Sequence, residues 1–355
     1  MKLEDIGLND QILAYMEEEE LILEEVGRVI VEHKERYIVQ TEDGALNAEI
    51  TGNLRYSAES RVDFPAVGDW VKIAVYDQDS AVILSVLPRI SILERQAIGK
   101  FGERQLIATN VDVAFIMQAV GHDFNLNRLE RYLSICHASQ ITPIVVLSKT
   151  DLGSPEETQQ LKDQINHRHQ DIPVIALSNE SLEGLNDIGD HIEKGKTYCI
   201  LGSSGVGKSS LINNLLNKEQ MKVSNISEAT AKGRHTTSHR ELFVLEEGGV
   251  IIDTPGMREL GMTDNSQGLE LTFADLAEIA EQCKFNDCTH TNEVGCAILE
   301  ALDNEEIDED ALENFLKLKR EQAHFESSVR EKRAKDKKLG KLYKRIQEDK
   351  RKRKF

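Results

Sequence analysis

Residues 202–209 read GSSGVGKS, which fits the phosphate-loop pattern G-x-x-x-x-G-K-[S/T]. The apolar run TYCIL before this loop is typical of a buried strand, and SLINNLL after it has helical spacing. Between a strand and a helix, the glycines let backbone N–H groups turn inward around phosphate oxygens. A plain glycine- and serine-rich connector does not explain a lysine directly before the first helical turn. The loop is therefore predicted to bind nucleotide phosphates.

Phosphate chemistry assigns a role to each part of this loop. Lys208 should reach the β- and γ-phosphate oxygens, which gives it a catalytic role, and the Ser209 hydroxyl should ligate Mg²⁺. The predicted nucleotide-binding residues of the loop are Gly202, Ser203, Ser204, Gly205, Val206, Gly207, Lys208, Ser209 and Ser210.

Two segments that follow the loop add to the predicted phosphate site. VIIDTPG places Asp253 at a strand end, where an acid suits Mg²⁺ through a water molecule, and the Gly256 N–H is placed to sense a γ-phosphate. The intervening AKGRHTTSHREL contains Thr236 and Thr237, one of which could supply a second hydroxyl to Mg²⁺. By itself this stretch is more typical of a polar surface loop, and only its position between the other motifs favours a role at the site.

An earlier segment, VVLSKTDL, ends a buried strand at Ser148, Lys149, Thr150 and Asp151. The carboxylate of Asp151 can accept two hydrogen bonds, from the N1–H and the 2-amino group of guanine, and adenine offers no matching pair of donors. The stem of Lys149 can lie over the purine ring. This segment is therefore predicted to bind the base.

A second strand end, in VIALSNESLEGL, carries Ser178 and Asn179, whose backbone N–H groups could meet the guanine oxygen. Either base motif alone would also fit an ordinary polar strand end, so the prediction depends on their order and spacing. An alternative is a phosphate-loop ATPase that carries a zinc module, formed by the cysteine-rich segment described next. Asp151 argues against this alternative. The expected ligands are GTP and GDP.

The segment CKFNDCTHTNEVGC has the spacing of a metal site, C-x4-C-x-H-x5-C, and its four potential ligands are Cys283, Cys288, His290 and Cys296. Three thiolates and one imidazole make a closed tetrahedral set for one structural Zn²⁺, with no position left for a substrate. Three buried cysteines near a stray histidine would be the alternative. Such clustering is improbable in a chain with only five cysteines, so zinc is preferred.

The 355-residue chain is acidic overall, with 62 Asp and Glu against 43 Lys and Arg, but its charge is uneven. Residues 330–355 contain 14 basic and four acidic side chains, a net charge of +10. The rest of the chain holds 29 basic and 58 acidic side chains, a net charge of −29. This contrast suggests a polyanionic partner reached by the tail, and a solvated, disordered charge run fits the composition equally well.

Targeting signals and disulfides are not indicated. The N-terminal MKLEDIGLNDQILAYMEEEE is acidic and lacks the apolar run of a signal peptide, and no stretch approaches eighteen apolar residues. An odd number of cysteines, three of them crowded together, argues against a secreted disulfide framework. We expect a cytoplasmic protein without membrane contact.

Hydrophobic patterning divides the chain into parts of different class. Between residues 24 and 96, short strands with turn signals, beginning with the alternating GRVIVEHKERYIVQT, predict a small β-barrel. An OB-fold is preferred over an SH3-like barrel, and a purely structural barrel fits at least as well as a nucleic-acid-binding one. After residue 105, strands alternate with helices, which predicts an α/β domain with a mostly parallel, doubly wound sheet.

The order of the nucleotide motifs is inverted, because the base motif at Asp151 precedes the phosphate loop at Gly202. The chain therefore resembles a circularly permuted GTPase, in which the same strands occupy the same sheet and only the connections differ. The barrel, the zinc spacing and the motifs VGDWV, LPRISILERQ, NVDVAFIMQA, KGRHTT and DTPGMREL extend the resemblance over nearly the whole chain to the RsgA family.

Resemblance to the RsgA family implies GTP hydrolysis stimulated by the small ribosomal subunit during its late maturation, with hydrolysis driving release. It also implies that the barrel and the zinc domain face the rRNA, and that His235, in GRHTT, is the catalytic histidine proposed for the family. The alternative is a nucleotide-gated rRNA-binding module in which hydrolysis is incidental. A monomer is expected. An acidic body is a poor nonspecific RNA binder, so either local basic patches on the barrel and the zinc domain suffice or the basic tail supplies much of the affinity. We expect the tail to order on rRNA.

Three positions depart from the usual pattern. Ser148 stands where the base motif usually begins with Asn, and the missing amide should cost about 1 kcal/mol of GTP binding while leaving guanine selectivity intact. Asn179 follows Ser178 where Ala is usual. Met257 occupies the position of a water-orienting Gln in many GTPases, so slow unaided turnover is expected.

The chain is thus expected to hold three folded domains between two charged segments. The expected parts are an acidic N-terminal extension (1–23), an OB-like β-barrel (24–98), a circularly permuted GTPase domain (99–264), a helical zinc-binding domain (265–329) and a basic tail (330–355). The tail has too few apolar residues to pack, so disorder is expected there.

Overall fold

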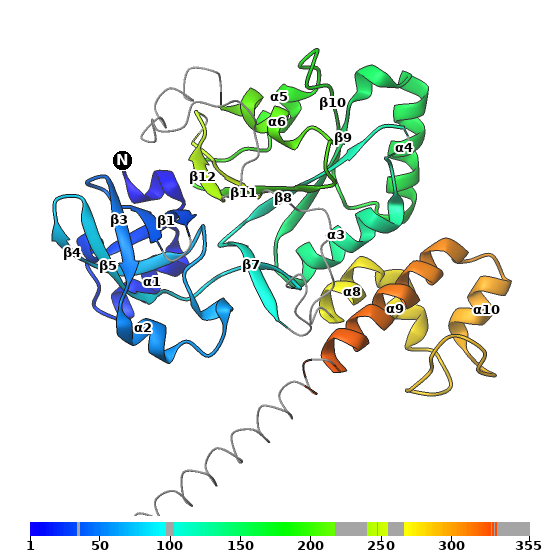
Figure 1. Ribbon diagram of the computed structural model, residues 1–355. Coiled ribbons are helices and arrows are strands. Elements are labelled where there is room, and N and C mark those ends of the chain that lie inside the picture. The colour runs from blue at the N-terminus through cyan, green and yellow to red at the C-terminus, as the bar shows by residue number, and fades with distance from the viewer. Residues whose placement is uncertain are drawn as a thin grey trace, which may run out of the picture.

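A computed structural model describes residues 1–33, 36–96, 103–121, 123–216, 240–246, 248–254 and 266–327, and also residues 329 and 331. A central sheet with its helices lies between an N-terminal barrel and a group of C-terminal helices (Figure 1). The predicted residues that lie outside the described ranges are His235, Thr236, Thr237, Gly256 and Met257. Most of the basic tail is outside them as well. Among the helices that are described, none combines the length and the apolar character needed to cross a bilayer.

The barrel has five strands, β1 (Val26–His33), β2 (Arg36–Gln40), β3 (Ala45–Ile50), β4 (Trp70–Asp77) and β5 (Ser80–Val86), with α2 (Gly52–Ser57) after β3. They pair in the order β1-β2-β3-β5-β4, and β4 pairs again with β1, so the barrel is closed. Only the β3–β5 pair is parallel among these. This is the Greek-key barrel of an OB-fold, as the sequence predicts.

The acidic N-terminal extension packs onto the barrel. It forms η1 (Leu3–Ile6), α1 (Asp10–Glu18) and η2 (Leu23–Glu25). Its buried side chains, which share a cluster with Trp70 of β4, are Leu3, Ile6, Leu8, Ile12 and Met16. The apolar residues of the extension are therefore part of the folded structure, and its acids cover the outer side.

The central domain follows the predicted alternation of strands and helices. Its parallel strands are β8 (Val113–Ala119), β9 (Thr142–Ser148), β10 (Val174–Leu177), β11 (Thr197–Gly202) and β13 (Val250–Asp253), in the order β10-β9-β8-β11-β13. Its helices are α3 (Leu126–Ala138), α4 (Pro155–Arg168), α5 (Leu185–Gly189) and α6 (Lys208–Leu215). Helices α3 and α4 contribute to one hydrophobic cluster, and α5 and α6 to another on the opposite face. The doubly wound sheet is confirmed, and its carboxyl edge carries the nucleotide motifs.

An antiparallel strand joins the barrel to this sheet. Strand β12 (Glu241–Val244) pairs with β13 on one side and with barrel strand β1 on the other, so a single 11-stranded sheet runs through both domains. A separate hairpin of β6 (Ile92–Gln96) and β7 (Arg104–Thr109) connects the barrel to the central domain along the chain. The sequence does not predict the junction between β1 and β12.

The C-terminal part is helical, with α8 (Ser266–Thr272), α9 (Ala274–Ala280), α10 (Ala297–Asp303) and a further helix over residues 309–327. Helix α8 packs closely on α3, because Gly268 lies where a Cβ would be 2.1 Å from the Ser134 carbonyl oxygen. Phe273 and Phe315 meet edge to face, with ring centroids 5.5 Å apart, inside the cluster that also covers α3. The C-terminal helices and the central domain thus share one hydrophobic core.

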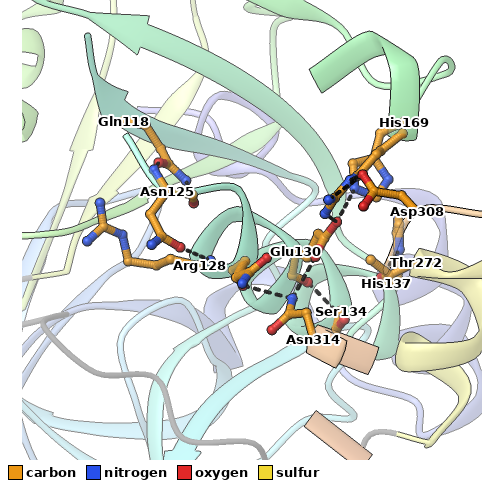
Figure 2. Close-up of polar contacts among 12 residues, drawn as sticks. Gln118, Asn125, Arg128, Glu130, Ser134, His137, His169, Thr272, Asp308 and Asn314 are labelled. Carbon is orange, nitrogen blue, oxygen red and sulfur yellow. Dashed lines mark hydrogen bonds and ion pairs between the residues drawn. The ribbon is translucent and has the colours of Figure 1, made fainter. Parts of the chain in front are cut away.

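A buried carboxylate lies within this shared core (Figure 2). Glu130 of α3 is fully buried and accepts hydrogen bonds from Arg168 of α4 (2.9 Å) and from Asn314 of the 309–327 helix (2.6 Å). Arg168 also pairs with Asp308 at 2.7 Å. Burial alone would lower the pKa of Arg168, but its bonds to Glu130 and Asp308 outweigh this effect and raise the pKa. Charged hydrogen bonds therefore connect α3, α4 and the C-terminal helices.

Candidate functional site

The phosphate loop runs from Gly202, at the end of β11, to Lys208, at the start of α6. Gly202 has a φ of 143°, and a Cβ there would lie 2.4 Å from the Met117 carbonyl oxygen. Gly207 has a φ of 98°, and a Cβ there would lie 2.7 Å from the Asn179 amide nitrogen. Glycine is therefore required at both positions, because φ is positive there and a Cβ would lie too close to a neighbouring atom. The loop leads into a helix N-terminus, whose N–H groups favour phosphate.

Lys208 lies inside the curve of this loop. Its ammonium donates to the carbonyl oxygens of Gly202 (2.8 Å) and Ser203 (2.6 Å). Burial lowers the pKa of Lys208, and the carboxylates of Asp253 and Asp123 oppose that shift. The ammonium charge of Lys208 is therefore held at the loop by neutral carbonyl groups. Phosphate oxygens can take the place of these carbonyls and accept stronger, charge-assisted hydrogen bonds from the ammonium.

The two predicted base motifs meet at the carboxyl ends of β9 and β10, which are neighbouring parallel strands. Asp151 is exposed there, in η4 (Thr150–Leu152), and accepts a hydrogen bond from the Ser178 hydroxyl at 2.7 Å. The Ser178 N–H donates to the Glu183 carbonyl at 3.0 Å. Ser178 thus acts on the site through its hydroxyl, which orients the carboxylate, and its N–H is used within its own loop.

Two side chains from the base motifs bind carbonyl groups of the phosphate loop. The buried Ser148 hydroxyl donates to the Val206 carbonyl at 2.7 Å, and the Asn179 amide donates to the Gly207 carbonyl at 3.2 Å. Asn214 of α6 holds the Asn179 side chain by donating to its amide oxygen at 3.1 Å. Ser148 and Asn179 are the two described positions that depart from the usual pattern. Their hydrogen bonds connect the base and phosphate halves of the site.

The strand that carries Asp253 lies next to the phosphate-loop strand. Its position is held by the buried Thr254, whose hydroxyl donates to the Ile200 carbonyl of β11 at 3.0 Å. Ser209 and Ser210 are exposed on the first turn of α6. Carboxylate and hydroxyl oxygens are the ligands that Mg²⁺ prefers. The described part of the site therefore contains suitable donors for the predicted magnesium ion.

Asp123 is a residue of the site that sequence reasoning missed. It follows β8 and accepts a hydrogen bond from the Ser203 hydroxyl of the phosphate loop at 2.7 Å. Arg128 of α3 pairs with the same carboxylate at 3.1 Å and also donates to the Asp123 carbonyl. The available signal was an acid shortly after the end of a buried strand, which is the same signal that identified Asp151 and Asp253.

The four predicted metal ligands converge in the C-terminal part. Their ligand atoms all lie within 4.8 Å of one another. The Cys283 and Cys296 sulfurs are 3.9 Å apart, and the His290 Nδ1 lies 3.6 Å and 3.5 Å from them. A tetrahedral zinc ion with Zn–S of about 2.3 Å and Zn–N of about 2.0 Å separates its ligand atoms by about 3.5–3.8 Å. The arrangement with Cys288 thus fits one zinc ion bound through Nδ1 of the histidine.

Comparison with known proteins agrees with this combination of parts. The sequence profile of the family described as RsgA GTPase matches residues 86–263. A relative from Bacteroides thetaiotaomicron, named small ribosomal subunit biogenesis GTPase RsgA 1, is 41% identical over 325 residues, which cover 91% of this chain and 90% of the relative. The chain belongs to the RsgA GTPase family. Another relative comes from Methanosarcina acetivorans and is named small ribosomal subunit biogenesis GTPase RsgA. It is 40% identical over 319 residues, which cover 88% of this chain and 85% of the relative.

Two solved structures share the fold of this chain. The crystal structure of YjeQ from Thermotoga maritima is 25% identical, with a TM-score of 0.61, and covers 83% of this chain and 96% of its own. The crystal structure of YloQ, described as a circularly permuted GTPase, has a TM-score of 0.59 at 23% identity and covers 86% and 95%. The order of Asp151 before Gly202 predicts a circularly permuted GTPase fold, and the similarity to these structures confirms that fold.

A second family profile, described as ABC transporter, matches residues 185–343. That range contains the phosphate loop, which ATPases and GTPases share, and excludes Asp151. The RsgA GTPase profile spans the base motif, and the RsgA-family relatives match over most of the chain. The second match therefore reflects the shared loop, and the protein is a GTPase of the RsgA family.

Proposed function

We propose that this RsgA-family GTPase binds the small ribosomal subunit and assists or checks its late maturation, with the subunit stimulating hydrolysis and hydrolysis driving release. The observation that carries this proposal is the carboxylate of Asp151, oriented by Ser178 beside the phosphate loop, in a chain whose relatives are named small ribosomal subunit biogenesis GTPases. The barrel and the C-terminal helices flank the GTPase sheet (Figure 1), and we expect these parts to contact rRNA.

The proposed roles in nucleotide binding follow from the chemistry of each group. Asp151 accepts from the N1–H and the 2-amino group of guanine, Lys208 donates to the β- and γ-phosphate oxygens, and the Gly256 N–H senses the γ-phosphate. Magnesium, when bound, neutralises charge on the phosphates. The residues proposed to hold it are Ser209, Thr236 or Thr237, and, through water, Asp253.

Replacing the proposed catalytic His235 with alanine should lower subunit-stimulated GTP turnover by about 10²- to 10⁴-fold, which is the usual contribution of a positioned acid–base group. GTP affinity should stay at the wild-type value, because no role in binding is assigned to His235. Turnover and equilibrium GTP binding of the variant check this expectation. His239→Ala, four residues further on, is the matched control, and equal turnover in the two variants would remove the role of His235.

Co-sedimentation with purified small subunits tests whether hydrolysis drives release. The protein should remain on the subunit with a non-hydrolysable GTP analogue and leave it with GTP. GTP turnover measured in the same mixtures should rise when subunits are present. Equal retention with both nucleotides would favour the alternative in which the protein is an rRNA-binding module and hydrolysis is incidental.

We further propose that the cysteine–histidine cluster binds one structural zinc ion. Cys288 and Cys296 are buried in the hydrophobic cluster shared with the GTPase domain, so zinc binding should contribute directly to folding. Cys296→Ser should therefore lose the zinc and unfold at lower temperature, as measured by metal analysis and thermal unfolding. Cys136→Ala, at a buried cysteine of the same hydrophobic cluster but outside the cysteine–histidine cluster, should keep one zinc per chain. Full zinc content in Cys296→Ser would contradict the assignment.

A further inference from the structure

One row of paired residues crosses from the barrel to the nucleotide site. Val31 of barrel strand β1 pairs with Glu241 of β12, and Glu241 pairs in turn with Asp253 at the end of β13. Asp253 is the strand-end acid of the phosphate site, so only one strand separates the barrel from it. Figure 1 shows β12 at the side of the sheet that faces the barrel.

An ion pair lies directly beside this row. Arg240 donates to the Glu32 carboxylate at 3.2 Å, and the two side chains are 17% and 33% exposed. Glu32 follows Val31 in β1, and Arg240 precedes Glu241 in the chain. The ion pair therefore links β1 to the start of β12 directly beside the Val31–Glu241 pairing.

The charge surrounding Arg240 makes Glu32 the important partner. Arg95 of the β6–β7 hairpin donates to Gln105 at 3.2 Å and 3.1 Å, and its positive charge interacts unfavourably with that of Arg240. Burial lowers the pKa of Arg95, and the charge of Arg240 lowers it further. Glu32 offsets this repulsion where the barrel, the hairpin and β12 come together.

The other end of β1 is anchored by a buried arginine. Arg28 is fully buried and donates to the carbonyls of Gly68 (3.1 Å), Asn110 (3.2 Å) and Ile6, with its guanidinium 5.5 Å from the Trp70 ring centre. Asn110 belongs to the segment that leads into β8 of the GTPase sheet. Because Arg28 fixes one part of β1, displacement of the barrel on binding would act mainly at the other end, where Glu32 contacts Arg240.

We propose that Glu32 and Arg240 are a positioning pair that makes GTP turnover respond to the contact between the barrel and the small subunit. This inference rests on the proposed function, because it assumes that the subunit stimulates hydrolysis. Arg240 lies three residues after Thr237 and five after His235, so three to five residues of chain connect it to the proposed magnesium and catalytic groups. A shift of β1 is transmitted through the ion pair and the Val31–Glu241–Asp253 row to the strand-end acid of the phosphate site.

Single and double variants of the full chain test this proposal. Glu32→Gln and Arg240→Gln should each lower the subunit-stimulated kcat about tenfold, a typical strength of coupling between sites. The KM for subunits and the affinity for GTP should stay within about twofold of wild type, because neither side chain is proposed to touch nucleotide or RNA. The charge-reversed double variant, Glu32→Arg with Arg240→Glu, should regain most of the lost kcat.

The matched control is Glu49→Gln, which removes one carboxylate from an exposed barrel pair, Arg36–Glu49, with an N–O distance of 3.6 Å. This variant should keep the wild-type kcat. Single variants that behave like Glu49→Gln overturn the proposal, as does a loss of kcat that the double variant fails to restore or that comes with loss of GTP affinity. Wild-type turnover that does not rise with subunits would overturn the proposed function itself, and this inference with it.

Discussion

Replacing Asp151 with asparagine is expected to weaken GTP binding about 10²- to 10⁴-fold, since two hydrogen bonds from guanine to a carboxylate contribute about 1.5–3 kcal/mol each. The asparagine amide would also present a donor to the 2-amino group, which is a donor itself. Asp151 is exposed and bonded to the Ser178 hydroxyl, so its replacement alters the site and leaves the core intact. Equilibrium GTP binding, with the unfolding midpoint measured in parallel, checks this expectation.

Xanthosine triphosphate provides the complementary measurement. Its base has a carbonyl in place of the 2-amino group, so the asparagine amide can donate to it, and Asp151→Asn should bind it more tightly than wild type does. Asp171→Asn is the matched control, because Asp171 is also exposed and lies just before β10, at the other end of that strand from Ser178. Equal GTP affinity in Asp151→Asn and wild type would show that Asp151 does not bind the base.

Replacing Glu130 with alanine is expected to lower the free energy of unfolding by about 3–5 kcal/mol, which is the usual cost of removing one partner from a buried ion pair. The substitution leaves the Arg168 guanidinium, 10% exposed at its side chain, with Asp308 as its remaining acidic partner among the described residues. It also removes one of the two acceptors of the Asn314 amide, the other being the Asn127 carbonyl. It also leaves a cavity where the carboxylate was. Urea unfolding followed by circular dichroism measures the loss.

A second ion pair at the same interface is the control for Glu130. Arg131, the next residue of α3, pairs with Glu321 of the 309–327 helix at 2.7 Å, with side chains 24% and 33% exposed. Glu321→Gln should cost only about 0–1 kcal/mol, because solvent weakens the attraction and hydrates the charge that remains. If the two variants lose the same free energy of unfolding, the burial of Glu130 does not explain the contribution of its hydrogen bonds to stability.

The elements that could be predicted are those whose signals lie within a few residues. PEETQQLKDQINHR forms α4, one of the helices in the predicted alternation, because Ser154 caps the helix with its side chain and Pro155 starts it at the first position. The apolar run at residues 113–119 is a strand covered on both faces, as parallel sheets require. Zinc ligands and phosphate-loop residues were found in the same way, because both are identified by residue type at short spacing.

Other features depend on contacts that no local pattern records. Nothing in LNRLERYLS indicates that Glu130 is fully buried, because its partners are 38 and 184 residues away in the chain. The acidic N-terminal extension has buried apolar residues, but the many acids between them obscure the apolar periodicity that would predict their burial. Asp123 was missed since its contact with Ser203 crosses 80 residues.

The sequence by itself predicted the chemistry of this protein: the loop proposed for phosphate, the carboxylate proposed for guanine, the four potential zinc ligands and the inverted order of the nucleotide motifs. Each of these is encoded by side-chain type and short spacing, so it can be read before the chain is folded. Only the tertiary structure decided that β12 joins the barrel to the GTPase sheet, with Val31 opposite Glu241. The two strands are separated by about 200 residues of chain, and their pairing depends on the packing of both domains rather than on either segment alone.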